Sequence, residues 1–110
     1  MTVDITEKDG VNIVALSGDV DLQTSPKVRQ GLLECLESHD KVLVDMSQVN
    51  YIDSSGVASL VEAFQVSRTK GAFFALVHVS PAAMRVLNLA RLDKVFSIFQ
   101  TIEEALSAGG

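Results

Sequence analysis

Two short acidic stretches contain the residues best suited to chemistry. The first is Asp53-Ser54-Ser55-Gly56, in which two hydroxyls directly follow a carboxylate, and the second is Gly18-Asp19-Val20-Asp21. A serine at the start of a helix can cap that helix. It can also accept a phosphoryl group, which adds about −1.5 to −2 charges. The serine stretch is therefore a candidate modification site, and ordinary turn and cap formation is the plain alternative.

Other catalytic and metal-binding chemistries find little support in the residues. His39 and His78 have no neighbours at ligand spacing, and Cys35 lies on the apolar side of an expected helix. There is no glycine-rich phosphate loop, and the serine stretch lacks the first glycine of a nucleophile elbow. We therefore expect no metal, no cofactor and no enzymatic activity. Nucleotide binding by the domain stays an alternative that titration with GTP and ATP would decide.

Composition limits the classes of partner. The chain has 110 residues, enough for one domain, and 47 % of them are hydrophobic. With 14 acidic and 9 basic residues the net charge is −5, which argues against nucleic-acid binding. A single cysteine cannot form an internal disulfide. No signal peptide or apolar run of about 20 residues is visible, so we expect a cytoplasmic location without membrane insertion.

Hydrophobic periodicity and turn residues place these stretches on secondary structure. The pattern predicts an edge strand over 3–7, an Asp9-Gly10 turn and a second strand over 11–16. The acidic loop 17–21 follows, and a helix begins at Ser25 as its cap and ends near residue 38. Further along, we expect a strand over 41–45, a loop over 46–52 and a helix that begins at the serine turn and runs over 57–70. Last come a strand over 72–79, a helix from Ser80 to about 90, a strand over 95–99 and a helix from 102 to about 107.

The resulting order is β-β-α-β-α-β-α-β-α, which predicts an α/β fold. Its mixed, mostly parallel sheet opens with an antiparallel hairpin. Residues 1–110 form one domain, with a frayed tail at about 108–110. Both acidic stretches follow strands at the carboxyl edge of the sheet, where α/β proteins place function, so they should be neighbours. We expect the free N–H groups of the helix to soften a phosphate charge there. Ala58 and Ala63 are candidates for the outward face of that helix.

At this level of detail the chain resembles the STAS domain, and more narrowly the stand-alone anti-sigma factor antagonists of bacteria. The resemblance covers nearly the whole chain. It is carried by Gly18-Asp19-Val20-Asp21, by the run from Leu43 to Val57 that contains Asp-Ser-Ser-Gly, and by Ser80-Pro81 followed by Leu87, Leu92 and Val95-Phe96. Two departures are Val57 and Asp19, where leucine and glutamate are common in the family.

The resemblance implies a partner switch. In such families a serine kinase that doubles as an anti-sigma factor binds the unmodified antagonist and releases its sigma factor. Phosphorylation of the hydroxyl after the motif aspartate, here Ser54 with Ser55 as its rival, switches binding off, and a PP2C-type phosphatase reverses it. The resemblance implies that Asp21 matches the family's acidic position in the first loop and Asp53 the one before the acceptor. We expect the partner-binding residues to be Asp19, Asp21, Asp53, Ser54, Ser55, Gly56 and Val57.

A second interpretation keeps the fold and changes the partner. Small STAS proteins also serve as subunits of lipid-transport ABC complexes, where they pack on the ATPase. That function would use the same helix surface without a phosphate. Co-purification with an ATPase rather than with a kinase would favour it.

Overall fold

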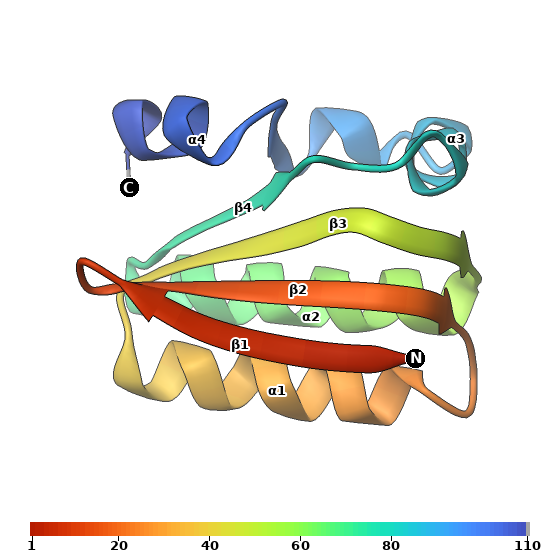
Figure 1. Ribbon diagram of the computed structural model, residues 1–110, viewed down its shortest axis with the longest axis horizontal. Coiled ribbons are helices and arrows are strands. Elements are labelled where there is room, and N and C mark those ends of the chain that lie inside the picture. Colours follow the sequence, from red (N-terminus) through yellow and green to blue (C-terminus); the bar gives the residue numbers. More distant parts are fainter. Residues whose placement is uncertain (110) are drawn as a thin grey trace.

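The computed structural model describes residues 1–109, which fold around one five-stranded sheet (Figure 1). The strands are β1 (Thr2–Lys8), β2 (Val11–Val20), β3 (Lys41–Ile52), β4 (Phe73–Val77) and β5 (Ser97–Phe99), and their order in the sheet is the order in the chain. β1 and β2 are antiparallel, and every other neighbouring pair is parallel. The predicted fold class, including the opening hairpin, is confirmed.

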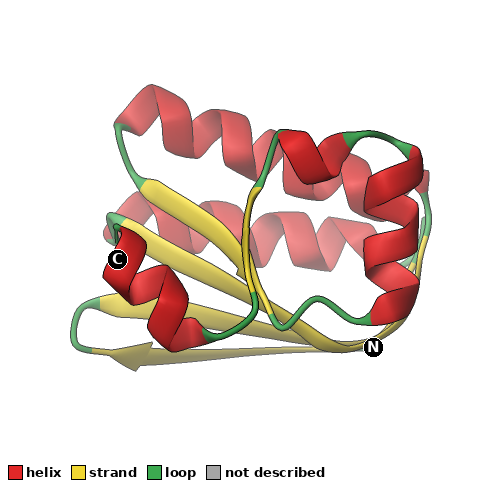
Figure 2. Ribbon diagram, turned by 90° about the horizontal axis from the view of Figure 1, so that it is seen from above, coloured by secondary structure: helices red, strands yellow, loops and turns green. Residues whose placement is uncertain are grey.

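Helices cover both faces of this sheet. α1 (Ser25–Ser38), α2 (Ser54–Lys70) and α3 (Pro81–Leu89) connect successive parallel strands and share one hydrophobic core with the sheet, whereas α4 (Ile102–Ala108) packs on the opposite face. Figures 1 and 2 show α4 separated from α1 and α2 by the strands. A 3-10 helix, Leu92–Lys94, precedes β5. No helix in residues 1–109 has the length and apolar character needed to cross a membrane.

The apolar run at the start of β3 is explained by its position between the two cores. Val42 and Val44 face α1 and α2, and Leu43 between them faces the α4 side; all three are fully buried. Successive side chains of a strand point to opposite faces, so a central parallel strand must be apolar at every position. This part of β3 was predicted correctly.

The hairpin turn also forms as its residues predict. Asp9 and Gly10 have φ values of 53° and 81°. Positive φ at both central residues defines the type I′ turn, whose twist matches that of the flanking strands. The strand register then pairs Lys8 with Val11, directly across the turn.

Two predicted loops are instead strand, and this is the main correction to the expected fold. β2 continues through Gly18 and Asp19 to Val20, and β3 continues through residues 46–52. The two strands stay paired over this extension, with register shifts between Ala15 and Ser17 and between Gly18 and Asp19. Such bulges break the alternation of polar and apolar residues that identifies a strand in a sequence. Three buried side chains, Met46, Val49 and Ile52, nonetheless anchor the extension of β3.

The helix boundaries agree with the prediction except at α1. The Ser80 and Thr101 hydroxyls accept N–H groups of Ala83 and Glu104 and cap α3 and α4 as expected. Ser25, expected as the cap of α1, is already helical, and Thr24 stands at the cap position without a side-chain cap bond. β4 and β5 are shorter than predicted. In the expected frayed tail, Ala108 is the last residue of α4, and Gly110 lies outside the described residues.

Candidate functional site

The ends of β2 and β3 bring the two acidic stretches together. Asp19 pairs with Tyr51 and Val20 with Ile52 in the parallel ladder, and the backbone N–H of Asp53 donates to the carbonyl of Val20 at 3.1 Å. The predicted proximity of the two stretches at the carboxyl edge of the sheet is confirmed. The longer strands, rather than two loops, produce it.

Asp53 caps α2. Its Oδ1 atom accepts the backbone N–H groups of Ser55 at 2.9 Å and Gly56 at 3.2 Å. The cap is therefore the aspartate and not a serine hydroxyl, which leaves the Ser54 side chain without a capping role. Asp53 thereby occupies two of the N–H groups that were expected to soften a phosphate charge here.

Gly56 allows α2 to begin directly on the strand ends. A Cβ atom at this position would lie 2.7 Å from Cγ1 of Ile52, 2.7 Å from Cγ1 of Val20 and 3.1 Å from the Val20 carbonyl oxygen. Only glycine fits such an approach without moving its neighbours. The glycine therefore fixes the position of the helix start, and with it the position of Ser54.

The two serines differ in their access to solvent. Ser54, the first residue of α2, is exposed, whereas Ser55 is half-buried. The carbonyl oxygen of Ser55 accepts the hydroxyl of the buried Ser59 at 3.2 Å. An approaching enzyme would thus meet the hydroxyl of Ser54 first.

Asp21 braces the loop between β2 and α1. Its Oδ1 atom accepts the backbone N–H groups of Gln23 at 3.0 Å and Thr24 at 3.1 Å, and its own N–H donates to the Thr24 hydroxyl at 2.8 Å. The N–H of Thr24 is the main cause that lowers the pKa of the Asp21 carboxyl below its usual value. The predicted acidic contact residue therefore also has a structural role, whereas the side chain of Asp19 is exposed at the strand end.

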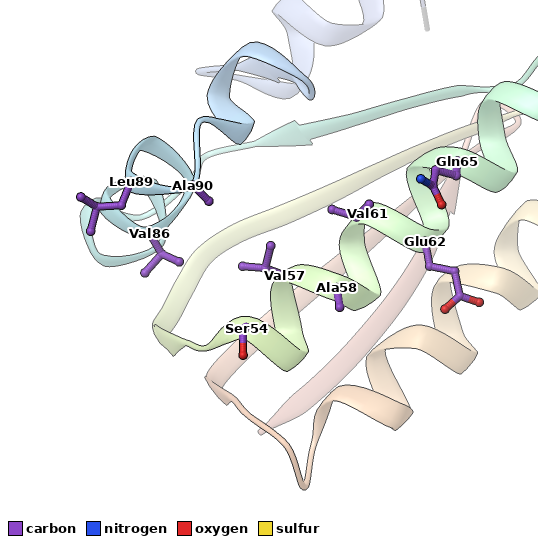
Figure 3. A pocket seen from close by; sticks show the side chains of 9 residues that line it. All are labelled: Ser54, Val57, Ala58, Val61, Glu62, Gln65, Val86, Leu89 and Ala90. Carbon is purple, nitrogen blue, oxygen red and sulfur yellow. The ribbon is translucent and has the colours of Figure 1, made fainter.

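An apolar groove begins at Ser54 and runs between α2 and α3 (Figure 3). Its volume is about 790 Å³. Val57 and Val61 lie on the side of α2 that is turned toward α3, and Val86 lies opposite them. The remaining lining residues are Ala58, Glu62, Gln65, Leu89 and Ala90. Apolar grooves with polar rims mark interaction sites on soluble proteins.

Both walls of this groove are attached to β3. The cap at Asp53 joins α2 to the end of the strand. The Ser80 hydroxyl at the start of α3 donates to the carbonyl of Val49 at 2.7 Å, and the Ser80 N–H donates to the carbonyl of Met46 at 3.2 Å. The backbone of one strand therefore sets the spacing of the two helices at the end near Ser54.

Large apolar side chains are exposed around the same end of the molecule. Leu89 on α3 is 81 % exposed, Leu22 in the loop before α1 is 74 % exposed and Tyr51 beside Asp19 is 52 % exposed. Ala58 faces outward as predicted, but Ala63 is buried against the sheet.

Sequence reasoning missed the contribution of α3. Leu87, one of the residues that carry the family resemblance, is buried, but no role was assigned to Val86 or Leu89. The sequence signal for this role was a second apolar stripe on the short helix α3, formed by Val86 and Leu89.

The remaining reactive side chains have structural surroundings. Cys35 is buried, and burial raises the pKa of its thiol. His39 is partly buried: its Nε2 atom lies 2.6 Å from Oε2 of Glu7 and its Nδ1 atom 3.0 Å from Nδ2 of Asn12. His78 lies just beyond the end of β4 rather than within it. Residues 1–109 contain no group of His, Cys, Asp and Glu side chains that could hold a metal ion.

Comparison with known proteins agrees with this geometry. The profile of the STAS domain family matches residues 2–105. The chain belongs to the STAS domain family. The anti-sigma F factor antagonist of Paenibacillus polymyxa is 27 % identical over 109 residues, which cover 97 % of this chain and 93 % of that protein. The anti-sigma-F factor antagonist RsfB of Mycobacterium tuberculosis is also 27 % identical, over 97 % of this chain and 88 % of its own length.

A solved structure extends the agreement to the backbone. An anti-sigma factor antagonist from Mycobacterium paratuberculosis is 30 % identical and superposes with a TM-score of 0.87, over 97 % of this STAS domain and 92 % of the other chain. The resemblance inferred from the motif residues is confirmed at the level of the family and the fold.

Proposed function

We propose that this STAS protein is an anti-sigma factor antagonist controlled by phosphorylation of Ser54. The unmodified form binds a serine kinase that acts as an anti-sigma factor and frees its sigma factor. Phosphorylation releases the antagonist, and a PP2C-type phosphatase restores the binding form. The observation that carries this proposal is the position of Ser54, exposed at the end of an apolar groove.

The groove supplies the binding energy in this proposal. Burying apolar surface stabilises a complex by roughly 25 cal/mol per Å², and the exposed side chain of Leu89 stands beside the groove as an anchor. Tyr51 and Leu22 can extend the contact along the ends of β3 and β2. Such a surface binds a partner without any rearrangement of the fold.

A phosphate on Ser54 would oppose this binding through its charge and its hydration. The added charge of about −1.5 to −2 would stand next to Asp53. Because the Asp53 carboxylate already accepts the N–H groups of Ser55 and Gly56, the helix start offers the phosphate little compensation. A partner covering Ser54 would have to strip water from this anion, which is costly.

The acceptor is tested with the cognate kinase and ATP. We expect one phosphate on the wild type and on Ser55→Ala, and none on Ser54→Ala, by intact-mass and peptide mass spectrometry. Ser55→Ala is the matched control because it removes the neighbouring hydroxyl. Modification confined to Ser55 would contradict the assignment.

The partner is tested by capture from native lysate with wild type and Ser54→Asp as baits. We expect a kinase bound by the wild type and lost with Ser54→Asp, and calorimetry should show the affinity falling at least tenfold, which corresponds to about 1.4 kcal/mol. Equal capture of an ATP-hydrolysing transport subunit by both baits would instead support the ABC-complex function.

A further inference from the structure

The outer edge of β1 is open to a second strand. Within residues 1–109, β1 is the first strand of the sheet and pairs with β2 alone. Its seven residues contain neither proline nor glycine, and all except Val3 are exposed. An edge of this length presents a row of backbone donors and acceptors that can pair with another chain.

The turn fixes which backbone groups face outward. In a two-residue type I′ hairpin the residues flanking the turn, here Lys8 and Val11, form a hydrogen-bonded pair. Antiparallel ladders alternate such pairs with non-bonded ones. The N–H and C=O groups of Thr2, Asp4, Thr6 and Lys8 therefore point to β2. Those of Val3, Ile5 and Glu7 point to the open edge.

We infer that a second copy of this chain pairs on this edge, with the two-fold axis at Ile5. This register places Ile5 opposite its own copy and Val3 opposite Glu7 of the second chain. Every outward-facing residue of the strand then belongs to a hydrogen-bonded pair. Ile5 is 47 % exposed, and cross-strand contact with its copy removes apolar surface from water.

The charges on the strand fit this register. On the face away from α1, Asp4 lies opposite Thr6 of the copy and Thr2 lies opposite Lys8 of the copy, so no like charges meet. Centring the axis on Asp4 would place two carboxylates opposite each other, which is destabilising. Centring it on Thr6 would pair Asp4 with Lys8, but it would leave Val3 outside the ladder.

The resulting dimer would leave the groove free. β1 contributes no residue to the lining of the α2–α3 groove, and in the sheet β2 separates it from β3 (Figure 1). A two-fold axis between antiparallel strands directs the carboxyl ends of the two β3 strands away from each other. The two copies of Ser54 would then stand at opposite ends of one continuous sheet. This inference does not depend on phosphorylation of Ser54.

Two lysine substitutions with the same change of net charge test the register. Thr6→Lys places a cation opposite Asp4 of the copy, twice per dimer, and Thr2→Lys places one opposite Lys8. In sedimentation velocity across a dilution series we expect the wild type to show a concentration-dependent dimer. The dimer of Thr6→Lys should be about two- to thirtyfold tighter than that of the wild type, from the usual range for cross-strand charge pairs. The dimer of Thr2→Lys should be weaker than that of the wild type.

Ile5→Pro provides a test of the hydrogen bonds. It removes an outward N–H and leaves the bonds to β2 in place, so it should give a folded monomer by circular dichroism and sedimentation. Monomeric wild type and Thr6→Lys at every concentration would overturn the inference. So would weaker dimers in both lysine variants, and so would a dimer that survives Ile5→Pro.

Discussion

Replacing Gly56 with alanine tests the link between packing and the position of Ser54, the proposed phosphate acceptor. The new methyl group would lie 2.7 Å from carbon atoms of both Ile52 and Val20, about 1 Å inside ordinary contact distance. Overpacking of this kind costs about 1–3 kcal/mol, and the gain from removing a helical glycine offsets about 0.5–1 kcal/mol of it. We expect a net loss of about 1–2 kcal/mol in the free energy of unfolding, or roughly 5–10 °C in Tm.

Gly31 in α1 is the matched control. A Cβ atom there would lie 3.5 Å from Cγ1 of Val3 and 3.9 Å from Cδ1 of Ile5, both ordinary contacts. Gly31→Ala should therefore stabilise the domain by about 0.5–1 kcal/mol. Urea unfolding followed by circular dichroism measures both variants. A Gly56→Ala protein as stable as Gly31→Ala would refute the argument that this glycine is required by the approach of α2 to the strand ends.

Two further predictions concern the groove and the loop. Leu89→Ala should weaken partner binding by about 1–2 kcal/mol with little change in stability. Leu87→Ala, two positions earlier and fully buried, should instead lower the free energy of unfolding by about 2–5 kcal/mol. Calorimetry with the captured kinase and urea unfolding separate the two effects, and equal binding by Leu89→Ala and the wild type would remove this residue from the interface. Because the folded pKa of Asp21 is lowered, its contribution to stability is present above the unfolded pKa of about 4 and is lost as the pH falls through the folded value. Asp21→Asn should therefore lose less stability between pH 7 and pH 3 than the wild type does, as measured by urea midpoints, and parallel losses would contradict this.

Motif chemistry and hydrophobic periodicity predicted the arrangement that positions the site. Val57, Leu60, Val61 and Phe64 identified α2, and the structure places all four on or next to the core. The apolar run that begins β3 needed no tertiary information, because a strand buried on both faces is apolar throughout.

Features that depend on contacts between distant residues were not predictable. Ser47, Gln48 and Asn50 are typical of a loop. In the structure Gln48 pairs with Ser17 of β2, and Ser47 and Asn50 lie at the register shifts of the extended ladder. The capping of α2 by Asp53 was one of several arrangements that the motif allows. The rotation of α2 about its own axis places Ala63 on the face that packs on the sheet, and the composition of the helix does not determine this rotation.

Because both groove walls are attached to β3, the residues that hold the helices in place differ from those that a partner would contact. Hydrogen bonds through the backbone and the side chains of Asp53 and Ser80 hold the frame. Ala58 and Leu89, which line the groove, are exposed and lie outside the core. Mutations at Ala58 or Leu89 can therefore accumulate without the loss of stability that eliminates most core mutations. In a cell with several STAS proteins, this frame would let each one diverge toward its own partner and so insulate parallel signalling pathways from one another.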